Sequence, residues 1–326
     1  MTVQSTQRQA TPVSVLICTR NRPQDIAFAL PTVMAQEYPC YEVILVDQST
    51  NEDTTRFVHE RFGTDPRLRY IRTATVGLSV ARNIALTEAR HEICAFTDDD
   101  CEVPSDWLSN IVQTFTRYPE THVLFSPVHI PPDLMGREGL YFPCLYFKDD
   151  RVLRRGEIFG MGAMALRKSF WELVGPFDPL LGAGAPMPGS DEHDWLYRAH
   201  RANAVIRLEP KNAILHRSWR ERSLWNRVAR SYACGDAAFA MKHLRCGDLA
   251  MLPVILRGLF YIGARGVLRI LQRDPGWRYE YNYVLGYWQG LWKSLSYRVD
   301  YRSRLFVAEP PASSSGLAAG TAPTVS

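Results

Sequence analysis

The chain has 326 residues, of which 46% are hydrophobic, and its formal net charge is +4. This length and composition suffice to bury a full core, so a small scaffold held together by disulfides is excluded. The seven cysteines are an odd number and form no C-x-x-C pair, which indicates neither a disulfide framework nor a zinc site.

The first half of the chain alternates between two patterns. Residues 1–12 are polar, without the apolar run of a secretory signal, and predict a short disordered lead. After them, short apolar runs alternate with amphipathic stretches. We expect strands at 13–18, 42–46, 68–71 and 93–96, and helices at 23–36, 54–62 and 78–89. This alternation predicts an α/β fold with a mainly parallel sheet covered by helices on both faces.

Polar segments follow three of the predicted strands, at residues 19–22, 47–50 and 97–100. In open sheets of this kind, ligands bind beyond the carboxyl ends of the strands. We therefore expect the ligand site among these segments. Further along, the proline-containing stretch 126–155 predicts loops and an insertion, and the glycine-rich stretch 182–189 predicts a mobile loop at the active site.

The pattern becomes helical from about residue 223. The most apolar stretch, 249–271, contains Arg257, Arg265 and Arg269, and each arginine costs roughly 2.5–3.5 kcal/mol at the centre of a bilayer. We therefore do not expect it to span a membrane. We therefore divide the chain into four parts. They are the lead (1–12), an α/β domain (13–218), a helical appendage (219–305) and a disordered tail (306–326).

The small net charge hides a difference along the chain. Residues 217–304 carry 16 Lys and Arg against 6 Asp and Glu, a net charge of +10, and the rest carries −6. This segment is also aromatic, with rings at positions 219, 225, 260, 261, 277, 287, 288 and 292. The composition predicts peripheral contact with an anionic membrane, and packing against the α/β domain or a second subunit is the alternative.

Three consecutive aspartates, Asp98, Asp99 and Asp100, follow the fourth predicted strand. Adjacent carboxylates repel one another unless a cation or several donors compensate, and a hard divalent cation is suited to oxygen ligands. No Lys or Arg lies near them in sequence. Because side chains alternate in extended chain, Asp98 and Asp100 can grip one ligand and its metal. An acidic turn that caps the helix near Pro104 is the alternative.

Two later features of the sequence could belong to the same site as the three aspartates. His216 could complete a divalent site if the fold returns it to them, and is otherwise a structural histidine. Asp191, Glu192 and Asp194 form a second acidic cluster after the glycine-rich loop, and a carboxylate there could deprotonate an acceptor hydroxyl. Acidic residues favoured by a helix N-terminus, with Ser190 as its cap, are the alternative.

Five ordered motifs in this chain resemble those of the family-2 glycosyltransferases of the GT-A fold. They are the opening strand and turn at 13–22, the second-strand signature at 36–47, G-L-S-V-A-R-N at 77–83, T-D-D-D with Pro104 and Trp107-Leu108, and D-E-H-D-W-L-Y-R at 191–198. Together they are far more specific than any one of them. The resemblance covers about residues 13–218.

The resemblance implies an inverting transfer of a sugar from a nucleoside-diphosphate sugar, UDP by default, to a hydroxyl of a glycan or lipid-linked acceptor. It implies a divalent cation, Mn²⁺ or Mg²⁺, and a role in cell-envelope or extracellular polysaccharide synthesis at the cytoplasmic side of the membrane. The implied metal ligands are Asp100, Asp98 and His216, and the implied base is Glu192, with Asp191 second. The implied nucleotide-sugar contacts are Thr19, Arg20, Asn21, Arg22, Asp47, Arg82, Asp98 and Asp99.

The chain departs from the family at two informative positions. Arg20 stands where an aromatic residue is common, although a guanidinium also stacks on a base. The order of Asp191 and Glu192 is inverted, which leaves both open as the base. An oxidoreductase is disfavoured because residues 18–22 contain no glycine for a dinucleotide turn. A non-catalytic protein that binds a nucleotide sugar or a glycan remains the alternative, and we expect no nucleic-acid partner.

Overall fold

The computed structural model describes residues 10–137, 140–141, 143–154, 157 and 163–307. Its main sheet has eight strands in the order β3-β2-β1-β4-β10-β6-β11-β9. The strands are β1 (Val13–Thr19), β2 (Tyr41–Asp47), β3 (Leu68–Arg72), β4 (Ile93–Phe96), β6 (Val123–Phe125), β9 (Arg151–Val152), β10 (Met164–Arg167) and β11 (Ile206–Leu208). Strand β1 pairs parallel with β2 and β4, and β2 pairs parallel with β3. Strand β10 is antiparallel to β4 and β6. The predicted α/β architecture is confirmed.

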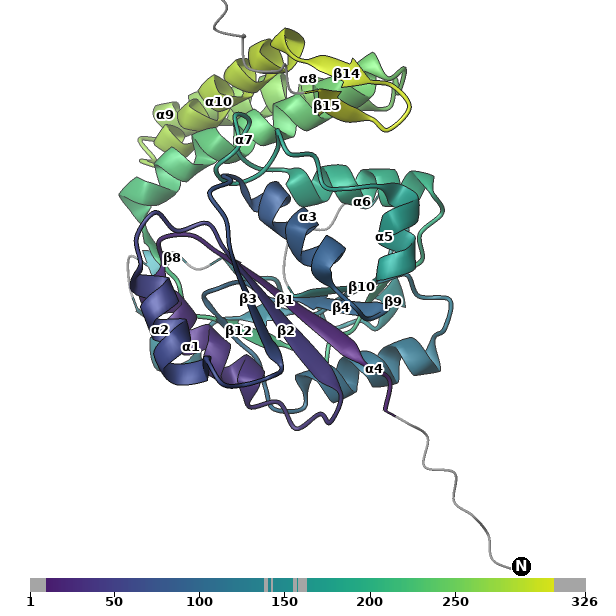
Figure 1. Cartoon of the computed structure of the whole chain (residues 1–326). Coiled ribbons are helices and arrows are strands. Elements are labelled where there is room, and N and C mark those ends of the chain that lie inside the picture. The colour runs from purple at the N-terminus through teal and green to yellow at the C-terminus, as the bar shows by residue number, and fades with distance from the viewer. Residues whose placement is uncertain (1–9, 138–139, 142, 155–156, 158–162, 308–326) are drawn as a thin grey trace, which may run out of the picture.

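Helices cover both faces of this sheet (Figure 1). One face carries α1 (Pro23–Met34), α2 (Asp53–Phe62) and α4 (Trp107–Arg117), and the other carries α3 (Leu78–Glu88), α5 (Lys168–Val174) and α6 (Asp191–Arg201). Each face has its own core, one containing Ile26 and Trp107 and the other Phe170 and Trp195. Every residue of β2 is buried because both of its faces are covered.

Short strands form three smaller sheets. The three-stranded sheet has the order β5-β12-β7, and the others pair β13 with β8 and β14 with β15. Their bounds are β5 (Cys101–Glu102), β7 (Val128–His129), β8 (Leu140–Tyr141), β12 (Ile214–His216), β13 (Arg220–Glu221), β14 (Arg298–Asp300) and β15 (Leu305–Val307). The predicted loop region 126–155 thus contains β7, β8 and β9, with a 3-10 turn η1 (Pro132–Leu134).

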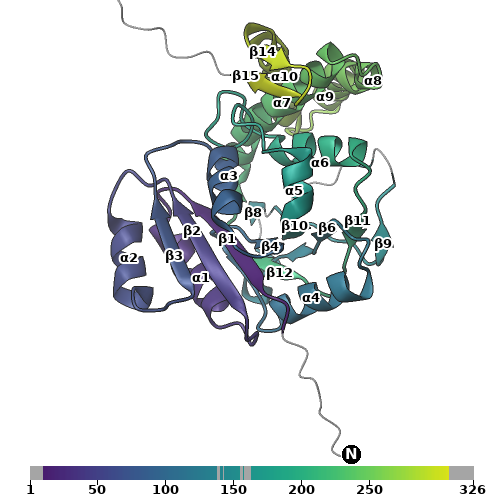
Figure 2. The same ribbon diagram turned by 45° about the vertical axis from the view of Figure 1, so that its right-hand side comes forward.

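The appendage lies over α3 and α6, on the side of the molecule away from α1 (Figures 1 and 2). It consists of α7 (Arg222–Arg245), α8 (Met251–Leu256), a π-helical turn η2 (Arg257–Tyr261), α9 (Ile262–Leu271) and α10 (Trp277–Ser296). Gly286 and Gly290 let α10 cross α7 closely, since a Cβ at either position would lie 2.1 Å from a carbonyl oxygen of α7.

The glycine-rich loop is held between the α/β domain and the appendage. Leu78 N donates to Ala183 O at 2.9 Å, and Ser79 Oγ donates to Leu181 O at 2.7 Å, which fastens the loop to the start of α3. On the opposite side, a Cβ at Gly235 of α7 would lie 2.4 Å from the carbonyl carbon of Gly189. The helix and the loop therefore touch backbone to backbone.

The prediction of a tail from residue 306 is wrong at its start. Phe306 lies in β15, is 4% exposed, and packs with Leu180 and Met187. Its apolar ring covers the glycine-rich loop, which explains the ordered strand. The rest of the predicted tail from residue 308, and residues 1–9 of the predicted lead, lie outside the described residues.

Met251–Leu271 meets the length and composition of a membrane-spanning helix, and 24% of its most apolar window is buried in the protein. Within the described part of the chain it is the one helix that does so. Our expectation that it does not span a membrane stays a prediction. Among the aromatic residues of the appendage, Trp292, Phe260 and Trp288 are mostly exposed, whereas Tyr287 belongs to the core.

Candidate functional site

The polar segments after β1, β2 and β4 meet at one edge of the sheet, as expected for parallel strands. Thr19 Oγ1 donates to Asp99 Oδ2 at 2.7 Å. Asn21 N donates to Ser49 Oγ at 2.8 Å, and Asn21 Oδ1 accepts from Thr50 N at 2.8 Å. The register of β1 against β2 and β4 therefore brings together residues that are up to 80 positions apart.

Arg22 forms ion pairs with two of the three aspartates, Asp99 and Asp100. Its Nη1 donates to Asp99 Oδ1 at 2.6 Å, and its Nη2 donates to Asp100 Oδ2 at 2.7 Å and to Ser218 Oγ at 2.8 Å. No Lys or Arg is near the triplet in sequence, but the sheet places the turn after β1 beside the end of β4 and so brings Arg22 to it. Burial raises the pKa of Asp99 to about 7, although Arg22 favours its charged form. Burial acts the same way on Asp100, but His216 and Arg22 outweigh it and lower its pKa.

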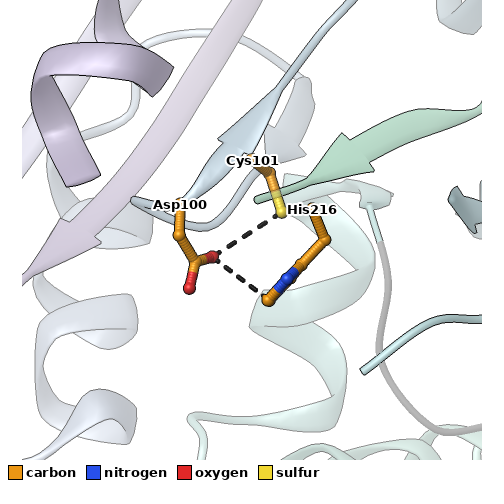
Figure 3. A group of neighbouring side chains, drawn as sticks. All are labelled: Asp100, Cys101 and His216. Atoms are coloured by element: carbon orange, nitrogen blue, oxygen red, sulfur yellow. Dashed lines mark hydrogen bonds and ion pairs between the residues drawn. The ribbon is translucent and has the colours of Figure 1, made fainter. Parts of the chain in front are cut away.

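The fold returns His216 to the aspartates. Strand β12 pairs antiparallel with β5, which sets His216 opposite Cys101. His216 Nε2 lies 3.4 Å from Asp100 Oδ1, and potential ligand atoms of Asp100, Cys101 and His216 all lie within 4.8 Å of one another (Figure 3). His216 Nδ1 is buried and has no hydrogen-bond partner among the described residues. This donor set fits a cation, and a hard divalent ion would use Asp100 and His216 in preference to the thiol.

Asp98 lies outside that group. Its side chain is 48% exposed, and its Oδ1 is 3.9 Å from Arg82 Nη2. Its expected role as a second metal ligand stays a prediction.

Arg82 joins the two acidic clusters. It lies on α3, is 4% exposed, and donates through Nη1 to Asp191 Oδ2 at 2.7 Å and to Glu192 Oε1. Burial raises the pKa of Glu192 to about 8, although Arg82 favours the charged carboxylate. One buried guanidinium thus joins the expected base, through Nη1, to the aspartate triplet, through Nη2, and Asp98 is the member of the triplet that it approaches.

The start of α6 differs from the expected serine cap. Ser190 has a φ of 58° and makes no capping hydrogen bond, and its Oγ instead donates to Asp236 of α7. Asp191 is backed by Gly182, whose φ is 101° and where a Cβ would lie 2.8 Å from the Asp191 carboxyl carbon. The glycine is therefore needed to bring the loop against the carboxylate.

The remaining expected nucleotide contacts have unequal positions. Asp47 is fully buried and accepts from Ser49 N at 2.7 Å and from Tyr70 OH at 2.6 Å. Asn21 holds the turn after β2, as described above. Arg20 is exposed at the same edge. Their contacts with a nucleotide stay predictions.

The profile of the family described as "Glycosyl transferase family 2" matches residues 14–174, which include the strand-end segments and the aspartate triplet. The chain belongs to this family. The match ends before α6, so the second acidic cluster lies beyond it.

Similar proteins agree with this assignment. A glucosyl-dolichyl phosphate glucuronosyltransferase of Haloferax volcanii is 25% identical over 230 residues, 67% of each chain. The uncharacterized protein y4gI of Sinorhizobium fredii is 30% identical over 162 residues, and the match spans 48% of this chain but 16% of that protein. The mannosyltransferase PcManGT from Pyrobaculum calidifontis, solved with GDP-Man and Mn²⁺, matches with a TM-score of 0.60 over 88% of both chains at 18% identity, which shows the GT-A fold.

The second acidic cluster divides into two sets of contacts in this family-2 chain. Asp194 faces away from Arg82 and is fully buried against Lys242, His243 and Arg198, at 2.6, 2.8 and 3.1 Å. Lys242 also contacts Asp178 Oδ2 at 2.6 Å. Sequence reasoning missed Lys242, whose one local signal is its place after the apolar run 237–241 on a helix.

Proposed function

We propose that this family-2 chain is an inverting glycosyltransferase that moves a sugar from a nucleoside-diphosphate sugar, UDP by default, to a hydroxyl of a glycan or lipid-linked acceptor. The observation that carries the proposal is the arrangement around Arg82, with Asp98 of the triplet on one side and Asp191 and Glu192 on the other. A buried arginine between two acidic groups is suited to a diphosphate that departs on one side and a hydroxyl that attacks from the other.

Asp100 and His216 are the residues that would hold a divalent cation, Mn²⁺ or Mg²⁺, with Asp98 as the further ligand. When bound, such an ion supplies charge neutralisation for a leaving diphosphate. Arg22 balances Asp99 and Asp100. Thr19 orients Asp99 through its hydroxyl, and Arg82 offers a second positive charge from α3.

We assign the general base to Glu192, with Asp191 as the alternative. Burial holds the pKa of Glu192 at about 8, near the range in which a base accepts and releases a proton efficiently. Asp191 is fixed between Arg82 and the glycine-rich loop, which suits a residue that positions its neighbour. Deprotonation of the acceptor by Glu192 needs no covalent enzyme nucleophile, so we expect inversion at the anomeric carbon.

We further propose that the enzyme works in envelope or extracellular polysaccharide synthesis, peripherally on the cytoplasmic face of the membrane. The appendage supports this placement because it is basic and exposes Trp292, Phe260 and Trp288, at 76%, 69% and 59%. The dolichyl-phosphate relative named above acts on a lipid-linked sugar by its name, which agrees with such an acceptor.

The decisive experiment is a screen for nucleotide release over a panel of UDP-, GDP- and dTDP-sugars, with and without glycan acceptors. We expect acceptor-stimulated release with one nucleotide class. Glu192→Gln should bind that donor as the native chain does in titration calorimetry and lose transfer. If Asp191→Asn is inactive and Glu192→Gln active, the base is Asp191. Donor binding without release in the native chain would instead establish the non-catalytic alternative.

A further inference from the structure

The appendage contains a cavity of about 710 Å³, and none of the three aspartates Asp98, Asp99 and Asp100 lines it. Its walls come from α7, α8, η2, α9 and α10, together with one residue of α6, and its volume is within the range of ligand pockets. Three tyrosines of α10 line it at a spacing of four residues, Tyr279, Tyr283 and Tyr287. Their rings stack with centroids 6.4 and 5.9 Å apart. Trp225 of α7 is a further aromatic residue of the wall.

A buried carboxylate in this wall lacks hydrogen bonds. Glu280 is 1% exposed, and neither of its side-chain oxygens has a hydrogen-bond partner among the described residues. Arg265 Nε and Arg269 Nε lie 3.2 and 3.3 Å from Oε1 as ion pairs, and both approach the same oxygen. A buried carboxylate oxygen without a donor is costly, so Oε2 is available to accept from a ligand.

The chemistry of the wall distinguishes between ligand classes. Aromatic rings offer apolar faces, and the Glu280 carboxylate can accept hydrogen bonds from hydroxyl groups. The Asp236 carboxylate already accepts from Ser190 Oγ and from Tyr283 OH. A phosphate would face both carboxylates. Three arginines line the cavity. Arg265 and Arg269 are paired with Glu280, and Arg257 has an interaction of its own. An uncharged, hydroxyl-rich ring matches this combination better than an anion does.

The cavity also shares an element with the catalytic group. His193 lines it, follows Glu192 on the first turn of α6, and has its Nδ1 3.7 Å from Asp236 Oδ1. Glu192 contacts Arg82 instead. Neither Glu192 nor the triplet of Asp98, Asp99 and Asp100 lines the cavity. We propose that the cavity binds an uncharged sugar unit of the acceptor glycan, other than the unit that reacts. This inference rests on the proposed function, because it takes Glu192 as the base that an acceptor must reach.

The test is ligand-observed saturation-transfer NMR on the full chain with methyl glycosides of neutral hexoses and N-acetylhexosamines. We expect at least one glycoside to bind the native chain, and its Kd to rise at least tenfold in both Tyr279→Ala and Glu280→Gln. Tyr281→Ala, at a 57% exposed position of the same helix, is the matched control and should bind normally. Absence of binding to the native chain, equal binding by all variants, or displacement of the glycoside by inorganic phosphate would overturn the inference.

Two further measurements separate this inference from the proposed function. Asp100→Asn should keep glycoside binding while it loses transfer. Conversely, Tyr279→Ala and Glu280→Gln should release nucleotide from the donor at the native rate when water replaces the acceptor, and show a raised KM for a glycan acceptor. Lost glycoside binding in Asp100→Asn would place the sugar at the donor site and overturn the inference. A native chain that binds glycosides in the cavity but never turns over a donor would defeat the proposed function and leave the cavity as a sugar site without an acceptor role.

Discussion

Replacement of Lys242 by methionine should destabilise the protein strongly. The Lys242 ammonium lies 2.6 Å from both Asp178 Oδ2 and Asp194 Oδ1, and all three side chains are fully buried. Asp194 would keep Arg198 and His243, but the donors left to Asp178 among the described residues would be the backbone N–H groups of Leu180 and Phe306. Removal of one partner from a buried ion pair costs about 3–5 kcal/mol.

That loss should be visible in two measurements. The unfolding free energy from guanidinium titration, followed by tryptophan fluorescence, should fall by the stated amount, and the midpoint of thermal unfolding should fall on the order of 10 °C. The exposed Lys211→Met is the control and should change stability by less than about 0.5 kcal/mol. Adding Asp178→Asn to Lys242→Met should recover part of the loss. A Lys242→Met protein within about 1 kcal/mol of the native chain would refute the reasoning.

Three further predictions concern the site and the appendage. Chelation by EDTA should abolish transfer and Mn²⁺ or Mg²⁺ should restore it, and Asp100→Asn should lower kcat/KM at least about 100-fold; undiminished transfer in excess EDTA would contradict this. Because the pKa of Glu192 is raised from 4.5 to about 8 on folding, the native chain holds a proton that the unfolded chain has lost between these values, so stability should fall as pH rises through that range. Transfer should rise over the same range as the base ionises, and Glu192→Gln should remove that group's part of the stability trend. The protein should co-sediment with anionic liposomes at low salt and less at high salt, since each basic residue near the membrane surface contributes roughly 1 kcal/mol. Trp292→Ala should weaken this attachment. Equal, negligible sedimentation with anionic and neutral liposomes would exclude membrane binding.

The elements of the first hundred residues could be predicted closely from the sequence. Their strands are continuous apolar runs, and α1 and α3 end within two residues of their expected limits, because local period and burial agree there. The parallel order then placed Thr19 beside Asp99 by a general rule of open sheets.

Long-range partners could not be predicted in the same way. The pairing of Arg22 with Asp99 and Asp100 depends on how the turn after β1 folds, and nothing local in the sequence encodes it. The same holds for Lys242, which meets Asp178 and Asp194 from a helix that follows the α/β domain. Counting charges along the sequence finds only pairs that are close in sequence. A buried ion pair depends on which residues the fold brings close in space.

The contact of Gly235 with Gly189 has a mechanical consequence. Where Gly235 meets Gly189, the backbones of α7 and of the loop that leads into α6 are in direct contact, so no flexible side chain absorbs a displacement at that point. A shift or tilt of the C-terminal helices on docking to a surface would be passed directly to the turn that carries Asp191 and Glu192. If the appendage docks as proposed, that attachment would reach the proposed base through rigid backbone contact, without a hinge.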